Sequence, residues 1–90
     1  MLLATTTVAD VDRFLEVFGT RGAEKRAEHG SKRAMVFGDP NEPSRGWAVF
    51  DWDEAGWTAF VTDPEVPNVL KDAGHLAKPQ AAGFLASFDA

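Results

Sequence analysis

Cysteine is absent from the 90-residue sequence, so neither a disulfide nor a thiolate metal site can stabilise the fold. The sequence also lacks an apolar run of about 20 residues, the length that crosses a bilayer. Residues 1–10 carry no basic segment of the kind that opens a signal peptide, and they already include the acidic Asp10. We therefore expect a cytoplasmic protein that has no membrane partner.

Positive charge is scarce after residue 33. Residues 34–90 hold three Lys/Arg against nine Asp/Glu, whereas residues 1–33 hold six against five. An acidic surface repels phosphate backbones, so we expect no nucleic-acid partner. The basic stretch is typical of a solvated helix face, because acidic residues alternate with its cations; these cations are Arg21, Lys25, Arg26, Lys32 and Arg33.

A chain of 90 residues fits a single domain, residues 1–90, and buries roughly 60–65% of the surface that it exposes when unfolded. Its hydrophobic share of 44% and charged share of 26% are typical of a folded globular protein. The core of so short a domain gives a small stability margin. Association with a second copy is a common remedy where disulfides are absent.

The first part of the sequence predicts a strand followed by a helical region. Residues 2–8 are rich in Leu, Thr and Val, as strands are. Asp10 offers an N-cap for a helix whose apolar residues recur at helical spacing over 11–18. Residues 23–28 are expected to resume this helix. Glycines are expected to interrupt and then end the helical region, and these are Gly19, Gly22 and Gly30.

A hairpin is predicted next. Residues 32–38 and 46–52 are strand-like and contain continuous apolar runs. Residues 39–44 between them are polar and contain two prolines. Because this connection is too short for a crossover helix, the two strands should be antiparallel.

The last part of the sequence predicts a second helical region and a fourth strand. Asp53 can cap a helix that buries Trp57 and Phe60, and Asp63-Pro64 is typical of a fresh helix start, so two helical pieces should meet near 62–63. Gly74 closes the second piece. Alternation of apolar side chains then predicts a strand over Gln80 to Phe88.

The order β-α-β-β-α-β predicts a ferredoxin-like α+β fold, in which a four-stranded antiparallel sheet carries both helical regions on one face. The other face should then be solvated and polar, yet strands two to four contain consecutive apolar residues that point to both faces. The helices can bury the side chains of one face only, and leaving those of the other face in water would expose a large apolar patch. On each strand one of two side chains would belong to that patch: Met35 or Phe37, Trp47 or Phe50, and Leu85 or Phe84. We therefore expect a homodimer whose two sheets pack face to face.

Three stretches carry a resemblance to a known superfamily: Gly30-Ser31-Lys32-Arg33, Asp39-Pro40-Asn41-Glu42-Pro43, and Phe50-Asp51-Trp52-Asp53 with Ala59-Phe60 and Asp63-Pro64-Glu65-Val66. With the element order, they make the whole chain resemble the dimeric α+β barrel superfamily. The chain looks especially like small members of its antibiotic-biosynthesis-monooxygenase-like branch. These stretches mark caps, turns and core, so they are informative about fold and weakly informative about function.

The resemblance implies chemistry that needs no cofactor, on an apolar or aromatic molecule held between sheet and helices. A base there takes a proton and neighbouring groups stabilise the resulting anion. His75 is the candidate base, although it could instead cap helical carbonyls, and His29 is expected to be exposed. The candidate pocket residues are Met35, Phe37, Trp57, Phe60 and Asn68.

Each of these residues also has a structural interpretation. Trp47, Trp52 and Trp57 could be core side chains, or indoles that stack on a flat ligand and donate a hydrogen bond to it. Asn68 could point into the pocket or into solvent. Arg33 could bind a carboxylate or form a surface ion pair.

Several activities are disfavoured. Haem-degrading members of the superfamily use an asparagine on the first strand, where this chain has Leu-Leu-Ala-Thr-Thr-Thr-Val. The spacing of His, Asp and Glu indicates no metal site, and there is no phosphate-binding glycine loop. Two hypotheses remain: a cofactor-independent monooxygenase or cyclase-like enzyme or small-molecule binder, and a non-catalytic homodimer with structural or interaction roles.

The dimer is directly testable. Burying each apolar side chain of the open sheet face is worth roughly 1.5–3 kcal/mol, so several per subunit should hold two copies together at micromolar concentration. Size-exclusion chromatography with light scattering is expected to give twice the mass of the chain. A monomer mass at that concentration would contradict the prediction.

Overall fold

The computed structural model describes residues 1–90 and shows an α+β fold. The predicted ferredoxin-like order is confirmed, and each helical region consists of two short helices. The elements are β1 (Leu2–Thr7), α1 (Val11–Phe18), α2 (Arg21–Glu28), β2 (Arg33–Gly38), β3 (Arg45–Asp51), α3 (Glu54–Thr62), α4 (Val66–Asp72) and β4 (Gln80–Gly83). None of these helices has the length and apolar character needed to cross a membrane.

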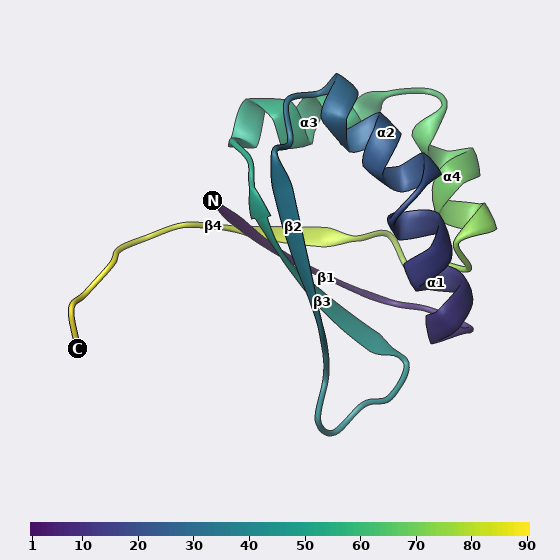
Figure 1. The fold of residues 1–90 in the computed structure, drawn as a ribbon, viewed down its shortest axis with the longest axis horizontal. Coiled ribbons are helices and arrows are strands. Elements are labelled where there is room, and N and C mark those ends of the chain that lie inside the picture. Colours follow the sequence, from purple (N-terminus) through teal and green to yellow (C-terminus); the bar gives the residue numbers. More distant parts are fainter.

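The four strands form one antiparallel sheet in the order β2-β3-β1-β4. The first strand of the chain lies inside the sheet and pairs on both sides. Leu2 of β1 is opposite Phe50 of β3 and Gly83 of β4. The loop end of the β2–β3 hairpin projects beyond the helices, as Figure 1 shows.

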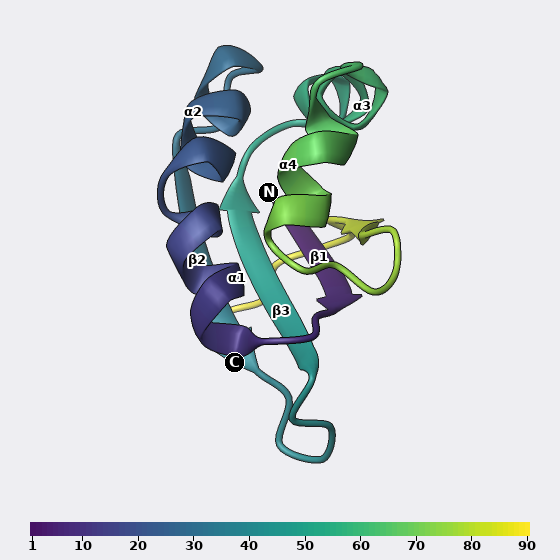
Figure 2. The same cartoon turned by 90° about the vertical axis from the view of Figure 1, so that its right-hand side faces the viewer.

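All four helices cover one face of the sheet in two columns. In Figure 2, α1 and α2 form one column, α3 and α4 form the other, and β3 is visible between them. Alternate residues of a strand point to opposite faces. Leu2, Ala4 and Thr6 of β1, together with Ala48 and Phe50 of β3, accordingly face the helices and are buried.

The core consists of two groups of buried side chains. One gathers around Phe50, Trp52 and Phe60, where α3 meets the end of β3. The other gathers around Phe14 and Val69, where α1 meets α4. The second group thus joins one helix of each column, and the space between the two groups lies over the middle of the sheet.

Two predicted caps are present. The Asp10 carboxylate accepts a hydrogen bond from the Arg13 backbone N–H at 3.0 Å, and the Asp53 carboxylate accepts one from the Gly56 N–H at 2.7 Å. Each satisfies an N–H that the first helical turn leaves without a partner. These caps fix where α1 and α3 begin after β1 and β3.

The predicted interruption of the first helical region is confirmed at Gly19 but is wrong at Gly22. The break falls between Phe18 and Arg21, and Gly22 is a buried residue in the first turn of α2. A side chain there would lie 3.0 Å from the Val17 carbonyl oxygen. Gly22 is therefore a position of close approach between α1 and α2, and close approach needs glycine as much as a helix break does.

The second helical region breaks at Thr62–Asp63, as predicted, but α4 begins later than predicted. Asp63 does not cap a helix that starts at Pro64; its carboxylate accepts a hydrogen bond from the Glu65 N–H at 2.8 Å and forms a turn. The first helical residue is Val66, and Pro67 occupies the first turn. Proline is equally suited to either position, because its missing N–H is one that the first turn leaves unbonded.

The fourth strand is much shorter than predicted. It ends at Gly83 and not at Phe88, and residues 84–90 leave the sheet as an extended segment, visible at the lower left of Figure 1. Gly83 pairs with Leu2, so β1 offers almost no chain for later residues to pair with. Phe84, Leu85 and Phe88 are consequently 61%, 97% and 83% exposed.

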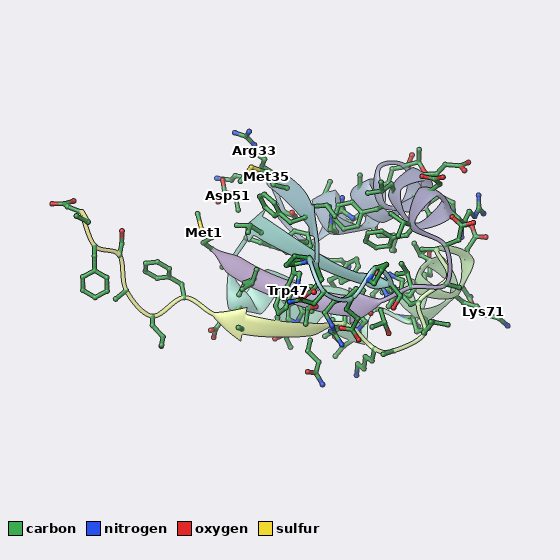
Figure 3. All side chains as sticks on the ribbon, turned by 90° about the horizontal axis from the view of Figure 1, so that it is seen from below. Met1, Arg33, Met35, Trp47, Asp51 and Lys71 are labelled. Carbon is green, nitrogen blue, oxygen red and sulfur yellow. The ribbon has the colours of Figure 1, made fainter.

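The face of the sheet away from the helices is apolar and uncovered in the single chain. Leu3, Met35 and Phe37 are 39%, 44% and 53% exposed there. Figure 3 shows Met35 beside Arg33 on the outer side of β2, away from the helices. The two-sided apolar pattern of the strands is therefore real, and the helices bury one side of it.

Substitution of Gly56 tests how closely α3 packs against Trp52 and the backbone at His29. A Cβ at this position would lie 2.5 Å from the His29 carbonyl oxygen and against the Trp52 indole nitrogen that donates to that oxygen. Gly56→Ala is expected to lower the free energy of unfolding by about 1–3 kcal/mol, measured by urea denaturation. Gly38→Ala is the matched control, because a Cβ at Gly38 meets no atom within 4 Å. Equal effects of the two substitutions would contradict this packing.

Candidate functional site

A cavity lies between the sheet and the two helix columns. Its volume is about 60 Å³, and its wall is largely aromatic and aliphatic. Phe14 and Phe18 from α1, Phe50 from β3, and Trp57 and Phe60 from α3 contribute to this wall. The cavity is well below the roughly 300 Å³ that a drug-sized ligand occupies, and it has room for about two water-sized molecules.

A larger groove adjoins the cavity. It has a volume of about 470 Å³ and runs along α4 and the segment that leads to β4. Leu70, His75 and Pro79 line both the groove and the cavity. The groove and the cavity therefore share part of their walls at His75.

The three tryptophans differ in how their indole N–H groups are used. The Trp47 N–H donates to the Asp39 carboxylate at 2.9 Å and holds the hairpin loop. The Trp52 N–H donates to the His29 carbonyl at 2.8 Å. The Trp57 N–H has no partner in the chain, and its half-buried ring lies 6.0 Å from the Phe60 ring in the cavity wall. Of the three, Trp57 alone keeps a free donor for a ligand.

His75 is held by a hydrogen-bond chain that determines its tautomer. Thr6 Oγ1 donates its single hydrogen to the Ala77 carbonyl oxygen at 2.8 Å. The 3.2 Å hydrogen bond between Thr6 Oγ1 and His75 Nδ1 then requires the hydrogen to be on Nδ1. The neutral imidazole keeps its lone pair on Nε2, which has no partner in the chain and is not fully buried.

The surroundings keep the His75 ring neutral. Burial lowers the pKa of His75 below its ordinary value of about 6.5, and the Ala77 carbonyl offsets this only in part. The ring also packs edge-on against Phe14, with the ring centres 5.6 Å apart. At neutral pH the site therefore offers an unprotonated nitrogen beside an apolar cavity.

The structure brings together only some of the predicted site residues. Trp57, Phe60 and His75 line the cavity. Met35 and Phe37 do not, because they point to the open face of the sheet. Asn68 is exposed on the outer side of α4 and lines neither the cavity nor the groove.

Ion pairs connect the two helix columns, which the sequence analysis did not predict. Asp72 at the end of α4 pairs with Arg13 at 2.7 Å and with Arg21. Asp63 pairs with Lys25 at 2.8 Å and accepts a hydrogen bond from His29 Nε2 at 2.9 Å. The basic stretch is therefore not simply a solvated helix face. Its spacing of Arg21, Lys25 and His29, each four residues apart, was the available signal for one helix face.

This spacing also places three metal-ligand residue types together. Glu28, His29 and Asp63 each have a ligand atom within 4.8 Å of the others. The Lys25 ammonium lies 2.6 Å from the Glu28 carboxylate and 2.8 Å from that of Asp63. The cationic position is thus filled by the side chain of the protein itself, and the group is an ion-pair network.

Comparison with known proteins supports the fold. The sequence matches no known family profile and no curated protein. Solved structures are similar: SnoaB, a cofactor-independent oxygenase from Streptomyces nogalater, has a TM-score of 0.71 at 15% identity, with 99% of this chain and 95% of that chain covered. A putative antibiotic biosynthesis monooxygenase from Deinococcus radiodurans has a TM-score of 0.64 at 16% identity, with 100% and 98% covered.

A conserved protein from Methanosarcina mazei is also similar, with a TM-score of 0.61 at 14% identity and with 90% of this chain and 85% of that chain covered. The chain thus has the fold of the antibiotic biosynthesis monooxygenase structures, as the resemblance predicted. Identities of this size establish a shared fold, and a shared fold does not select an activity.

The ion pairs at Asp63 make stability depend on pH. The hydrogen bond from Lys25, and then that from His29, hold the pKa of Asp63 well below its usual range. A carboxylate with a depressed folded pKa stabilises the fold above its unfolded pKa of about 4, and this contribution is lost as the pH falls toward the folded pKa. Asp63→Asn is therefore expected to lower the melting temperature at pH 7 and pH 5, and the gap should narrow below about pH 4.

Thermal denaturation followed by circular dichroism measures this gap. Asp89→Asn is the matched control, because Asp89 lies in the exposed C-terminal segment and makes no ion pair. It should leave the melting temperature unchanged across the range. A gap between wild type and Asp63→Asn that is the same at pH 3 and pH 7 would refute the ion-pair interpretation.

Proposed function

We propose that the protein is a homodimer that binds a small apolar or aromatic molecule and acts on it without a cofactor, with His75 as the base. The observation that carries this proposal is the position of His75. Its neutral ring stands where a ligand-sized groove meets the cavity, and its hydrogen bond to Thr6 leaves Nε2 free. The fold shared with a cofactor-independent oxygenase supports the same class of chemistry.

The chemistry of this arrangement is proton abstraction. Nε2 of His75 accepts a proton from an acidic hydroxyl or from a carbon next to a carbonyl, and an oxyanion forms on the ligand. The free indole N–H of Trp57 is the donor available in the wall to stabilise that charge. The apolar surroundings strengthen such a hydrogen bond because water is largely excluded.

The volumes determine how a ligand fits. An aromatic ring needs about 150 Å³ of enclosed space, more than the roughly 60 Å³ of the cavity. The ring therefore lies in the groove, and only the reacting part enters the cavity beside His75.

The open face of the sheet supports the homodimer. Leu3, Met35 and Phe37 form an apolar surface there that no part of the single chain covers. A second sheet packed against it would remove the exposed parts of these side chains from water. Because each residue is already about half buried, each would contribute roughly half of the 1.5–3 kcal/mol of full burial. The proposed pair of sheets leaves the helix face, and with it the groove, accessible on each subunit.

A non-catalytic homodimer is the alternative. The small volume of the cavity, about 60 Å³, favours it, because a protein with no ligand needs no larger space. In that case the aromatic wall is core, and the Thr6–His75 hydrogen bond serves only to join β1 to the segment before β4. The two functions differ in whether substitution of His75 affects binding more than stability.

Titration with 1-naphthol, an aromatic probe with an acidic hydroxyl, distinguishes them. We expect its amide shift changes in ¹⁵N NMR spectra to centre on Leu70, His75 and Leu76 of the groove. His75→Asn is expected to weaken binding about 3- to 10-fold, as expected for loss of one hydrogen bond, with little change in melting temperature. The wild-type affinity should be unchanged between about pH 7.5 and pH 6.5 and fall only at lower pH, because the pKa of His75 is depressed and protonation of the imidazole removes the acceptor.

Asn68→Ala is the control for this experiment. Asn68 is exposed on α4 and lines neither the groove nor the cavity, so the substitution should leave the affinity for 1-naphthol unchanged. Loss of binding and stability in equal measure in His75→Asn would favour the non-catalytic alternative. Shift changes confined to the open sheet face would contradict the proposed site.

A further inference from the structure

Arg26 is a buried, positively charged side chain that forms no ion pair with an acidic residue. It lies on α2, its residue is 8% exposed, and it lines the cavity. No carboxylate lies within ion-pair distance of its guanidinium. Its one hydrogen bond runs from Nη2 to the Phe18 carbonyl oxygen at 2.9 Å, where that oxygen ends α1. Buried charges in proteins are usually paired, so this one requires an explanation.

The neighbouring cations show how unusual this position is. Arg21 and Lys25, on the adjacent face of α2, pair with Asp72 and Asp63 of the opposite helix column. Arg26 and Gly22 instead face the cavity. Asp72 and Asp63 are thus matched to the outer cations, and Arg26 is left without an acidic partner. Burial lowers the pKa of Arg26 to about 10, which still leaves the side chain positively charged at neutral pH.

The guanidinium is also held in a fixed position. Its central carbon lies 3.7 Å from the centre of the Phe18 ring, so the plane is stacked and only its edges can bind. Gly22 leaves room for it, because a Cβ there would lie 3.1 Å from Nη1. Four of its five N–H donors have no partner in the chain, and no unpaired nitrogen is fully buried.

We propose that the cavity binds a carboxylate and that Arg26 is the residue that binds it. The ligand class that follows, resting on the proposed function, is a small aromatic or aliphatic acid whose carboxylate enters the cavity. A planar carboxylate can take two parallel hydrogen bonds from one guanidinium edge, which a lysine could not supply. The carboxylate of the ligand would supply the negative charge that no residue of the chain provides for Arg26.

Two pairs of probes test this inference. Acetate and acetamide are small enough for the cavity, and benzoate and benzamide add a ring. Within each pair the amide has the shape of the acid but carries no charge and has an NH2 group in place of one oxygen. Titration of the wild type, with the Arg26 Nε–Hε signal followed by ¹⁵N NMR, is expected to show at least 10-fold tighter binding of each acid than of its amide. This ratio corresponds to one charge-assisted hydrogen-bonded contact.

The variants separate charge from structure. Arg26→Gln keeps a donor for the Phe18 carbonyl and removes the charge, so it should abolish the preference for acid over amide. Arg26→Lys keeps the charge without the paired donors and should retain part of the preference, even if Arg26→Gln proves unstable. Arg21→Gln removes one positive charge of the same helix outside the cavity, and it should leave the preference intact.

The outcomes of the two pairs are distinguishable. If the acid and the amide bind equally, or if Arg21→Gln reduces the preference as much as Arg26→Gln, the carboxylate inference is overturned while binding of a ring can still stand. If acetate binds at Arg26 and neither ring compound binds, the carboxylate inference holds for aliphatic acids and is wrong for aromatic acids. If no acid binds, the carboxylate inference is overturned, whereas the 1-naphthol titration tests the proposed function separately.

Discussion

The arrangement of this protein depends on a sheet whose strands are apolar on both faces, with helices available for only one. The chain divides its helices into two short pairs, and each pair packs over a different part of the sheet. The two columns meet through ion pairs at Asp63 and Asp72 and through apolar contacts between α1 and α4. Between the two groups of core side chains, the space over the central strands is left as the cavity. The cavity lies on the face of the sheet that the helices cover. The opposite face has no helices and stays uncovered in the single chain.

The chemistry of the cavity comes from residues that the two columns contribute separately. Arg26 belongs to the first column, whereas Trp57 and His75 belong to the second column and the segment after it. A cationic, an indole and a neutral imidazole side chain therefore line a common space whose wall is almost wholly apolar. Each is positioned by a structural contact, with Phe18, with Phe60 and with Thr6 respectively. The same contacts explain why each residue could also be taken for core.

Much of the fold could be predicted because its signals are local. The caps at Asp10 and Asp53 and the apolar spacing of the helices depend on neighbouring residues alone. The end of β4 could not be predicted, because alternation continues to Phe88 while the partner strand has already ended at Leu2.

The site was less accessible to sequence reasoning. Trp57 and Phe60 were identified from one helix stripe, whereas Met35 and Phe37 were assigned to the pocket because alternation does not say which face is covered. Arg26 resembled its charged neighbours in sequence. Only the rotation of α2 against the opposite column distinguishes it.

The central position of β1 has a consequence for how the chain folds. Its partners are residues 45–50 on one side and residues 80–83 on the other, so the first strand synthesised cannot complete its pairing until almost the whole chain has emerged. Contacts of such long sequence separation slow folding, because the loop must be closed before the contact stabilises it. During synthesis, β1 exposes an unpaired apolar edge, and the rate at which β4 arrives sets how long that edge stays open to aggregation.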